Sequence, residues 1–133
     1  MEKMDKICLD TDFLIDARRG KEEAAEFLLD NEDKAIFAIT YVSLFEIYRG
    51  AFSSVNEEAQ VSAVDRLKTK FQMLNLSEES VKLAGKIMAR LNRTGETIDF
   101  RDLFIGTIAL VNGFAVKTRN LKHFNKITGL KVV

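Results

Sequence analysis

Short apolar runs recur along the chain, and polar residues flank each of them. The runs "ICL" (7–9), "AIFAI" (35–39) and "FAVKT" (114–118) are mostly apolar and have the length of short buried strands. The segments "MLNL" (73–76) and "LKVV" (130–133) are two further strand candidates. The pattern therefore predicts four to five short strands.

Between these runs, apolar residues recur every three or four positions, which is the spacing of one helix face. In the segment from Glu78 to Arg93, for example, Val81, Ala84, Ile87 and Leu91 mark such a face. Strands that alternate with helices are typical of an α/β domain with a mostly parallel sheet. Helices are predicted at 21–33, 57–71 and 77–93, after Thr40 and after Asp99, with a helical turn at "NLKHF" (120–124).

Polar residues that favour helix N-caps precede several of the helical stretches. Thr40, Ser77 and Asp99 stand directly before such stretches, and Asp12 stands before the apolar "FLI". Gly113 is placed to end the helix that Asp99 begins. These residues mark element boundaries in a chain that contains no proline.

Length and composition limit the class of protein. At 133 residues, the chain is long enough for one domain with a single sizeable core, so residues 1–133 are expected to form one domain. The composition, 47% hydrophobic and 30% charged, is that of an ordinary globular protein rather than a disordered one.

No apolar run is long enough to span a bilayer, and no apolar signal region follows "MEKMDK" at the N-terminus. The single cysteine, Cys8, lies in a predicted buried strand and has no partner for an internal disulfide. We therefore expect a cytoplasmic protein that makes no membrane contact.

The formal net charge is zero, but the charges are unevenly distributed. Residues 103–133 contain no Asp or Glu and five Lys or Arg residues, whereas the first 102 residues carry more acidic than basic side chains. A basic C-terminal segment on a neutral protein suggests a local anion site, and chance with simple solvation is an equal alternative.

Asp10 is out of place at the end of a buried strand, because a carboxylate is costly to bury without a partner. Only Lys6 is basic within four residues of it. Its partner must therefore come from far along the chain or from a bound ion. Asp12 is explained more simply, as a helix N-cap.

Two further acids lie in apolar surroundings. Glu46 lies within "VSLFEIY", and its ordinary explanation would be an ion pair with Arg49 or Arg101. Asp102 lies in the first turn of a helix that is apolar on all sides. It has a good alternative role there, because a carboxylate in that turn can support the N-cap and meet the positive helix end.

Considered together, Asp10, Glu46 and Asp102 indicate a functional site more strongly than any one of them alone. In open parallel sheets, ligands bind beyond the carboxyl ends of the strands. Asp10 ends the first strand, and Glu46 follows the second by one or two helix turns. Carboxylates that converge in one cleft cannot all ionise unless a cation is present. Oxygen ligands favour a hard ion, Mg²⁺ or Mn²⁺, which would serve phosphoryl transfer.

Four segments resemble the motifs of the PIN domain family, and more narrowly of VapC-type toxins. They are "CLDTDFLID", "ITYVSLFEIYRG", "RDLFIGTIAL" and "VKTRNLKHF", which occur in the family's order and spacing from about residue 6 to the end of the chain. The resemblance implies a three-layer α/β/α fold and a metal-dependent ribonuclease. It also implies a homodimer and control by a small antitoxin of the VapB type.

The resemblance also assigns residues. Asp10, Glu46 and Asp102 match the acidic cluster that holds the metal and carries catalysis. Thr118 and Asn120 match the last motif. That motif departs from many members, because Asn120 and His123 stand where acids often occur, and this departure puts a second tightly held metal in doubt. His123 is a candidate general acid, with packing or hydrogen bonding near the surface as the alternative.

The expected mechanism follows from these assignments. Asp10 and Asp102 hold one Mg²⁺, directly or through water, and Glu46 binds it or orients the attacking water. Arg119 and Lys122, with Arg49 and Arg101 as further candidates, contact the RNA backbone. Together with Thr118 and Asn120, Arg119 and Lys122 form the predicted substrate-binding set.

Two alternatives remain open from the sequence. The opening stretch "ICLDTDFL" also resembles the strand-end DxD of haloacid-dehalogenase-type phosphatases, in which Asp10 would be the nucleophile and Asp12 the proton donor. That alternative leaves Glu46 unexplained. The other is a non-catalytic RNA-binding module, which Asn120 supports.

Overall fold

A computed structural model describes residues 3–133, and its centre is one all-parallel sheet of four strands in the order β3-β2-β1-β4. In the register, Cys8 pairs with Ala38 on one side and with Val116 on the other. The predicted strand at 130–133 is not formed, because only Val132 bridges to Val116. The strands are β1 (Asp5–Leu9), β2 (Ala35–Thr40), β3 (Gln72–Leu74) and β4 (Ala115–Lys117).

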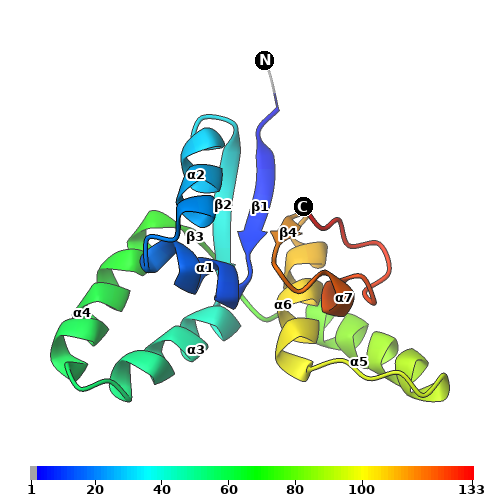
Figure 1. The fold of residues 1–133 in the computed structure, drawn as a ribbon. Helices are drawn as coiled ribbons and strands as arrows, with labels where there is room; N and C mark the ends of the chain where they lie inside the picture. Colours follow the sequence, from blue (N-terminus) through cyan, green and yellow to red (C-terminus); the bar gives the residue numbers. More distant parts are fainter. Residues whose placement is uncertain (1–2) are drawn as a thin grey trace.

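Helices cover both faces of the sheet, which gives the predicted three-layer α/β/α arrangement (Figure 1). One face carries α1 (Thr11–Arg18), α2 (Glu22–Asp30), α3 (Tyr41–Phe52), α4 (Glu57–Leu67) and a 3₁₀ turn (Lys68–Lys70). The other face carries α5 (Glu78–Arg93), α6 (Phe100–Val111) and the short α7 (Leu121–Phe124).

The side-chain alternation of β1 explains why two layers of helices are needed. Ile7 and Leu9 belong to the core beneath α1–α4, whereas Cys8 between them belongs to the core beneath α5–α7. Successive strand residues point to opposite faces, so a strand that is apolar on both faces must be covered on both. Burial of Cys8 raises the pKa of its thiol to about 12, so this cysteine is part of the core.

Three of the four predicted helix caps are confirmed. The side chains of Thr40, Ser77 and Asp99 each accept a hydrogen bond from a backbone N–H in the first turn of α3, α5 and α6. The assignment of Asp12 as a cap is wrong, because α1 begins at Thr11, two residues earlier than this assignment implies, and Asp10 is its N-cap. A residue with extended backbone between a strand and a helix can cap the helix that follows directly, and Asp10, which follows β1, does so.

Gly106 allows the C-terminal segment to pack closely on α6. A Cβ atom at this position would overlap the side chain of Ile127 and crowd Leu130 and Phe124. Phe124 and Ile127 are both fully buried. The close approach fixes α7, which carries His123, beside the beginning of α6, which carries Asp102.

The all-parallel topology brings the carboxyl ends of the strands to one edge of the sheet. Asp10 follows β1 there, Thr40 ends β2, and Thr118 follows β4. The predicted convergence of strand ends is therefore confirmed. Within residues 3–133, none of the helices has the length and hydropathy needed to cross a membrane.

Candidate functional site

A cavity of about 380 Å³ opens at the carboxyl ends of the strands and contains the three predicted acids. Asp10, Glu46 and Asp102, which come from three separate elements, all line it. Two further acids and three cationic or titratable side chains join them. The remaining lining residues are Thr11, Asp12, Ile15, Arg49, Asp99, Arg101, Asn120 and His123.

Asp10 is the most buried acid of this cavity, with 1% of its surface exposed. Its Oδ1 accepts a hydrogen bond of 2.8 Å from the Thr11 backbone N–H, and its Oδ2 accepts one of 2.7 Å from Thr118 Oγ1. The partner from far along the chain is thus a hydroxyl group. Burial, reinforced by the charges of Asp102 and Asp12, raises the pKa of Asp10 from 3.8 to about 6, although both hydrogen bonds lower it.

Glu46 is half-buried, and each of its carboxylate oxygens has a partner. Thr11 Oγ1 donates to Oε1 at 2.8 Å, and Arg101 Nη1 lies 3.5 Å from Oε2. Thr11 has one hydroxyl hydrogen, and the carboxylate can only accept, so Ser43 must be the donor in the 2.8 Å contact between Ser43 and Thr11. The ion pair expected for Glu46 is therefore the one with Arg101.

Asp102 lies in the first turn of α6 as expected, but among the described residues its carboxylate accepts no hydrogen bond from the backbone N–H of the N-cap Asp99. The Oδ2 atom of Asp102 lies 2.6 Å from His123 Nδ1 instead. His123 is thus a neighbour of the acidic cluster, and the expected hydrogen bond near the surface is present. The only feature of the sequence that relates Asp102 to His123 is the spacing between the last two motifs.

The residues of the last motif occupy different places. Thr118, which does not line the cavity, donates its hydroxyl hydrogen to Asp10. Asn120 lines the cavity, and its Nδ2 donates to Asp12 Oδ2 at 3.2 Å. Arg119 and Lys122 are exposed and do not belong to the lining.

Arg119 is tied to an acid of α1 that the sequence reasoning missed. Its Nε lies 3.1 Å from Asp16 Oδ2, and Asp16 is buried and also pairs with Lys21 at 3.2 Å. The only feature of the sequence that could have indicated this pair is the position of Asp16 directly after the apolar residues of the first helix.

The chemistry of the donors fits a hard divalent cation. Five carboxylates line one small cavity, and Asp10, the most buried of them, lies near Asp12 and Asp102 with no basic side chain bonded to it among the described residues. Within residues 3–133, no three acidic, histidine or cysteine side chains are already arranged as a coordination shell. Asp102 is turned toward His123 and Glu46 toward Thr11 and Arg101, so a cation would draw these side chains from their present partners.

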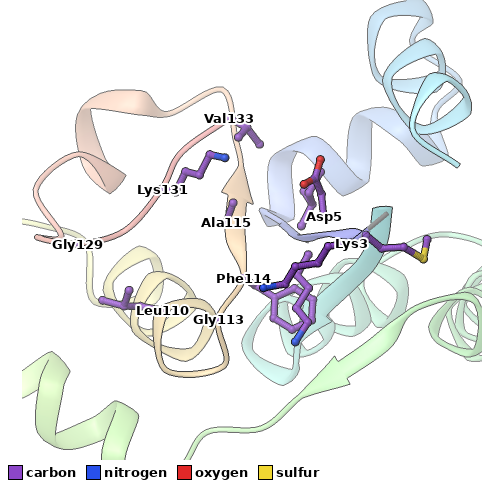
Figure 2. Close-up of a pocket in the computed structure, with 12 residues that line it drawn as sticks. Lys3, Asp5, Leu110, Gly113, Phe114, Ala115, Gly129, Lys131 and Val133 are labelled. Carbon is purple, nitrogen blue, oxygen red and sulfur yellow. The ribbon is translucent and has the colours of Figure 1, made fainter. Parts of the chain in front are cut away.

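A larger cavity, of about 630 Å³, lies at the opposite end of the sheet, where β1 and β4 begin. Its floor includes Phe114 and Ala115. Figure 2 shows Lys3 and Phe114 on one side of Ala115 and Lys131 on the other. One acidic side chain of the described residues, Asp5, lines this cavity, whereas five line the cavity at the carboxyl ends of the strands, which is therefore our candidate site.

Comparisons with known proteins identify the relatives of this chain. The chain is 30% identical to "Ribonuclease VapC1" of Methanocaldococcus jannaschii over 132 residues, which cover 96% of this chain and 86% of the relative. It is 29% identical to the "tRNA(fMet)-specific endonuclease VapC" of Salmonella typhimurium, with 96% of each chain covered. The crystal structure of DNA-bound VapBC from Salmonella typhimurium superposes with a TM-score of 0.85 at 26% identity, over 98% of both chains.

The sequence model described as "PIN domain" matches residues 7–130, which is nearly the whole chain. The matched range contains every acid of the cavity, including Glu46, which a phosphatase with an Asp10 nucleophile leaves without a role. The phosphatase alternative is therefore wrong, and this chain belongs to the PIN domain family.

Proposed function

We propose that this PIN-domain protein is a metal-dependent endoribonuclease and the toxin of a VapBC-type toxin–antitoxin pair. The observation that carries the proposal is the position of Asp10, a buried carboxylate facing Asp102 and Asp12 in a cavity lined by five acids. Such an arrangement is unfavourable for folding and useful for binding a cation, as is common at catalytic sites. Relatives over nearly the full chain are named ribonucleases.

Asp10, Asp102 and Glu46 would hold Mg²⁺ or Mn²⁺. The bound ion would polarise the scissile phosphate and lower the pKa of a water nucleophile. The protein groups around the acids have separate tasks. Thr118 and the Thr11 N–H orient the two oxygens of Asp10, and the Thr11 hydroxyl orients Glu46. Glu46 is then placed to accept a hydrogen bond from the attacking water.

The RNA backbone would contact basic side chains around the cavity. Arg49 and Arg101 line it, and Arg18 and Arg19 line a neighbouring cavity of about 440 Å³. Lys122, exposed on α7 next to His123 in the sequence, is a further candidate for such a contact. Contacts to phosphates give affinity that falls with salt, and sequence preference would come from unpaired bases.

The antitoxin would occupy the neighbouring cavity together with the acidic one. The two share Ile15 and Glu46, and the neighbouring cavity adds the apolar Ile47 and Ala51 of α3. Helix α2 does not line this cavity. We expect an arginine of the antitoxin to pair with Asp10 or Asp102, so that inhibition is partly competitive with Mg²⁺.

A homodimer is the further assembly that the family resemblance implies. Helix α3 exposes three large aromatic side chains, which are an unfavourable surface for a monomer in water. They are Tyr41, Phe45 and Phe52. We propose that this face of α3 forms the dimer contact.

The test of the proposed function is the choice of bond that the protein cleaves. Purified protein is incubated with Mn²⁺ and either a folded RNA, a single-stranded RNA or a small phosphomonoester. Internal cleavage of RNA that is lost in Glu46→Gln, without release of phosphate from the monoester, supports the proposal. RNA binding without cleavage under every metal condition would favour the non-catalytic RNA-binding module instead. The support for that alternative is Asn120, an amide at a position where many members of the family have an acid.

A further inference from the structure

The guanidinium group of Arg101 is held by Asp99 through two of its nitrogens. Its third nitrogen makes a weaker contact and can change its hydrogen-bond acceptor. Nε lies 3.2 Å from Asp99 Oδ1 and Nη2 lies 3.0 Å from Asp99 Oδ2, which is a bidentate contact. The third nitrogen, Nη1, points to Glu46 Oε2 at 3.5 Å. Arg101 thus connects an acid at the rim of the cavity with an acid inside it.

The two contacts differ in strength. Asp99 is fixed by the backbone, because its Oδ1 also accepts a 2.8 Å hydrogen bond from the Arg101 N–H as the cap of α6. The bidentate geometry adds both energy and direction. The contact to Glu46 is single, and its 3.5 Å length is at the limit of a hydrogen bond. It is therefore the contact that a better acceptor would replace.

Glu46 remains in place when it loses this contact. Its other oxygen, Oε1, accepts the 2.8 Å hydrogen bond from Thr11, whose side chain is buried. Release of Nη1 therefore frees Oε2 without releasing the carboxylate.

We propose that Arg101 is a phosphate-binding residue of the acidic cavity, whose Nη1 exchanges Glu46 Oε2 for a phosphate oxygen of the bound RNA while Asp99 holds the rest of the guanidinium. The inference rests on the proposed ribonuclease function and names a specific contact to its substrate. A phosphate that enters this cavity faces five carboxylates, so a cation already anchored inside it removes much of the repulsion. Because the same exchange frees Glu46, RNA binding also completes the set of acids available to the metal.

The exchange predicts opposite effects of one substitution on two ligands. Arg101→Gln removes a positive charge beside Glu46, so Mn²⁺ should bind several-fold more tightly in the absence of RNA. The same variant should bind a labelled, non-cleavable single-stranded RNA about fivefold more weakly at saturating Mn²⁺. The slope of log affinity against log salt should fall by about 0.7, the value for one phosphate contact on a single strand. Calorimetry measures the first quantity and fluorescence anisotropy the second.

Two further variants make the test specific. Arg101→Lys keeps the charge but cannot form the bidentate contact, so it should restore most of the salt slope. Arg90→Gln removes an exposed charge from α5, outside the cavity, and should leave both affinities unchanged.

Three outcomes would overturn the inference. Unchanged affinities in Arg101→Gln would show that Arg101 contacts neither ligand. Weaker binding of both ligands with a lower melting temperature would show a structural role at the start of α6, and Arg101→Lys would then fail in the same way. An RNA affinity that falls with an unchanged Mn²⁺ affinity would exclude the exchange with Glu46. Failure of the ribonuclease proposal is visible separately, as wild-type protein that cleaves no RNA with any divalent metal.

Discussion

Thr118 Oγ1 donates a 2.7 Å hydrogen bond to Asp10 Oδ2, which joins the end of β4 to the end of β1 across 108 residues of sequence. Thr118 is itself held, because its oxygen accepts a 2.9 Å hydrogen bond from the Asn120 N–H. A residue of the last motif, Thr118, therefore fixes the orientation of the Asp10 carboxylate by a hydrogen bond. Of the contacts that Asp10 makes, the one with Thr118 lowers its pKa most.

Thr118→Val tests this contact. The variant keeps the shape of the side chain and removes the hydroxyl donor, so the pKa of Asp10 should rise further above about 6. Carboxyl ¹³C NMR of the metal-free protein measures this pKa directly. Thr107→Val is the matched control, because Thr107 is also buried but its hydroxyl bonds the Phe104 carbonyl within α6. An Asp10 titration unchanged by Thr118→Val would contradict the proposed support.

Asp10 should also limit the stability of the metal-free protein. Its pKa is about 6 when folded and near 3.8 when unfolded, so the folded state prefers the neutral acid. Its contribution to stability is complete below about pH 3.8 and is lost as the pH rises through about 6, with a total loss of up to about 3 kcal/mol.

Asp10→Asn should therefore raise the melting temperature of the chelator-treated protein by several degrees at about pH 8. The gain should disappear near pH 4, where the wild-type side chain is neutral. Asp30→Asn, at an exposed position at the end of α2, serves as the control for the loss of one charge. A melting temperature several degrees lower for Asp10→Asn at about pH 8 would identify Asp10 as a structural residue instead.

The residue pattern was sufficient to predict a parallel α/β sheet and the convergence of Asp10, Glu46 and Asp102, and the family resemblance implied the three layers. Short apolar runs that alternate with helical stripes determine an α/β sheet, and parallel strands bring their carboxyl ends together whatever the detailed packing. The element boundaries were less predictable. Both Asp10 and Asp12 are suitable caps for α1, and only the three-dimensional path of the chain shows that the helix begins at Thr11.

The contacts between distant side chains were beyond the sequence. The 2.6 Å contact of His123 with Asp102 depends on how closely α7 packs on α6, which in turn depends on Gly106. The pairing of Arg119 with Asp16 likewise joins the segment after β4 to α1 through a geometry that no spacing rule predicts. The excess of basic residues at 103–133 was visible in the sequence. That one of them, Arg119, pairs with a buried acid of the same chain was not.

Arg119 and Lys122 should differ in what their substitution changes. Lys122→Gln removes an exposed charge, so it should reduce the salt dependence of RNA binding and leave the melting temperature unchanged. Arg119→Gln removes a partner of the buried Asp16 and should lower the melting temperature as well. Salt titrations and thermal melting of both variants measure this difference. Equal melting temperatures for the two variants would show that the Asp16 pair contributes nothing.

His123 should act as a positioning residue for Asp102. Its ring fixes Oδ2 of that carboxylate, and loss of such a partner typically costs tenfold to a hundredfold in activity or metal affinity. His123→Ala should therefore weaken Mn²⁺ binding in the absence of RNA and reduce kcat by a similar factor. His123→Asn, whose amide can still donate to Asp102, should recover part of both. A reduced kcat with unchanged Mn²⁺ affinity would point to proton transfer by His123 instead.

The central claim is that the acidic cavity cleaves RNA with the help of a divalent cation. The most direct measurement is the rate of RNA cleavage across a titration of free Mn²⁺ or Mg²⁺, with excess chelator as the zero point, for wild type, Asp10→Asn and Asp102→Asn. We predict saturable, metal-dependent cleavage by the wild type, none in chelator, and loss of cleavage in both variants, which remain folded. Cleavage of equal rate in excess chelator, or full activity of Asp10→Asn, would contradict the account.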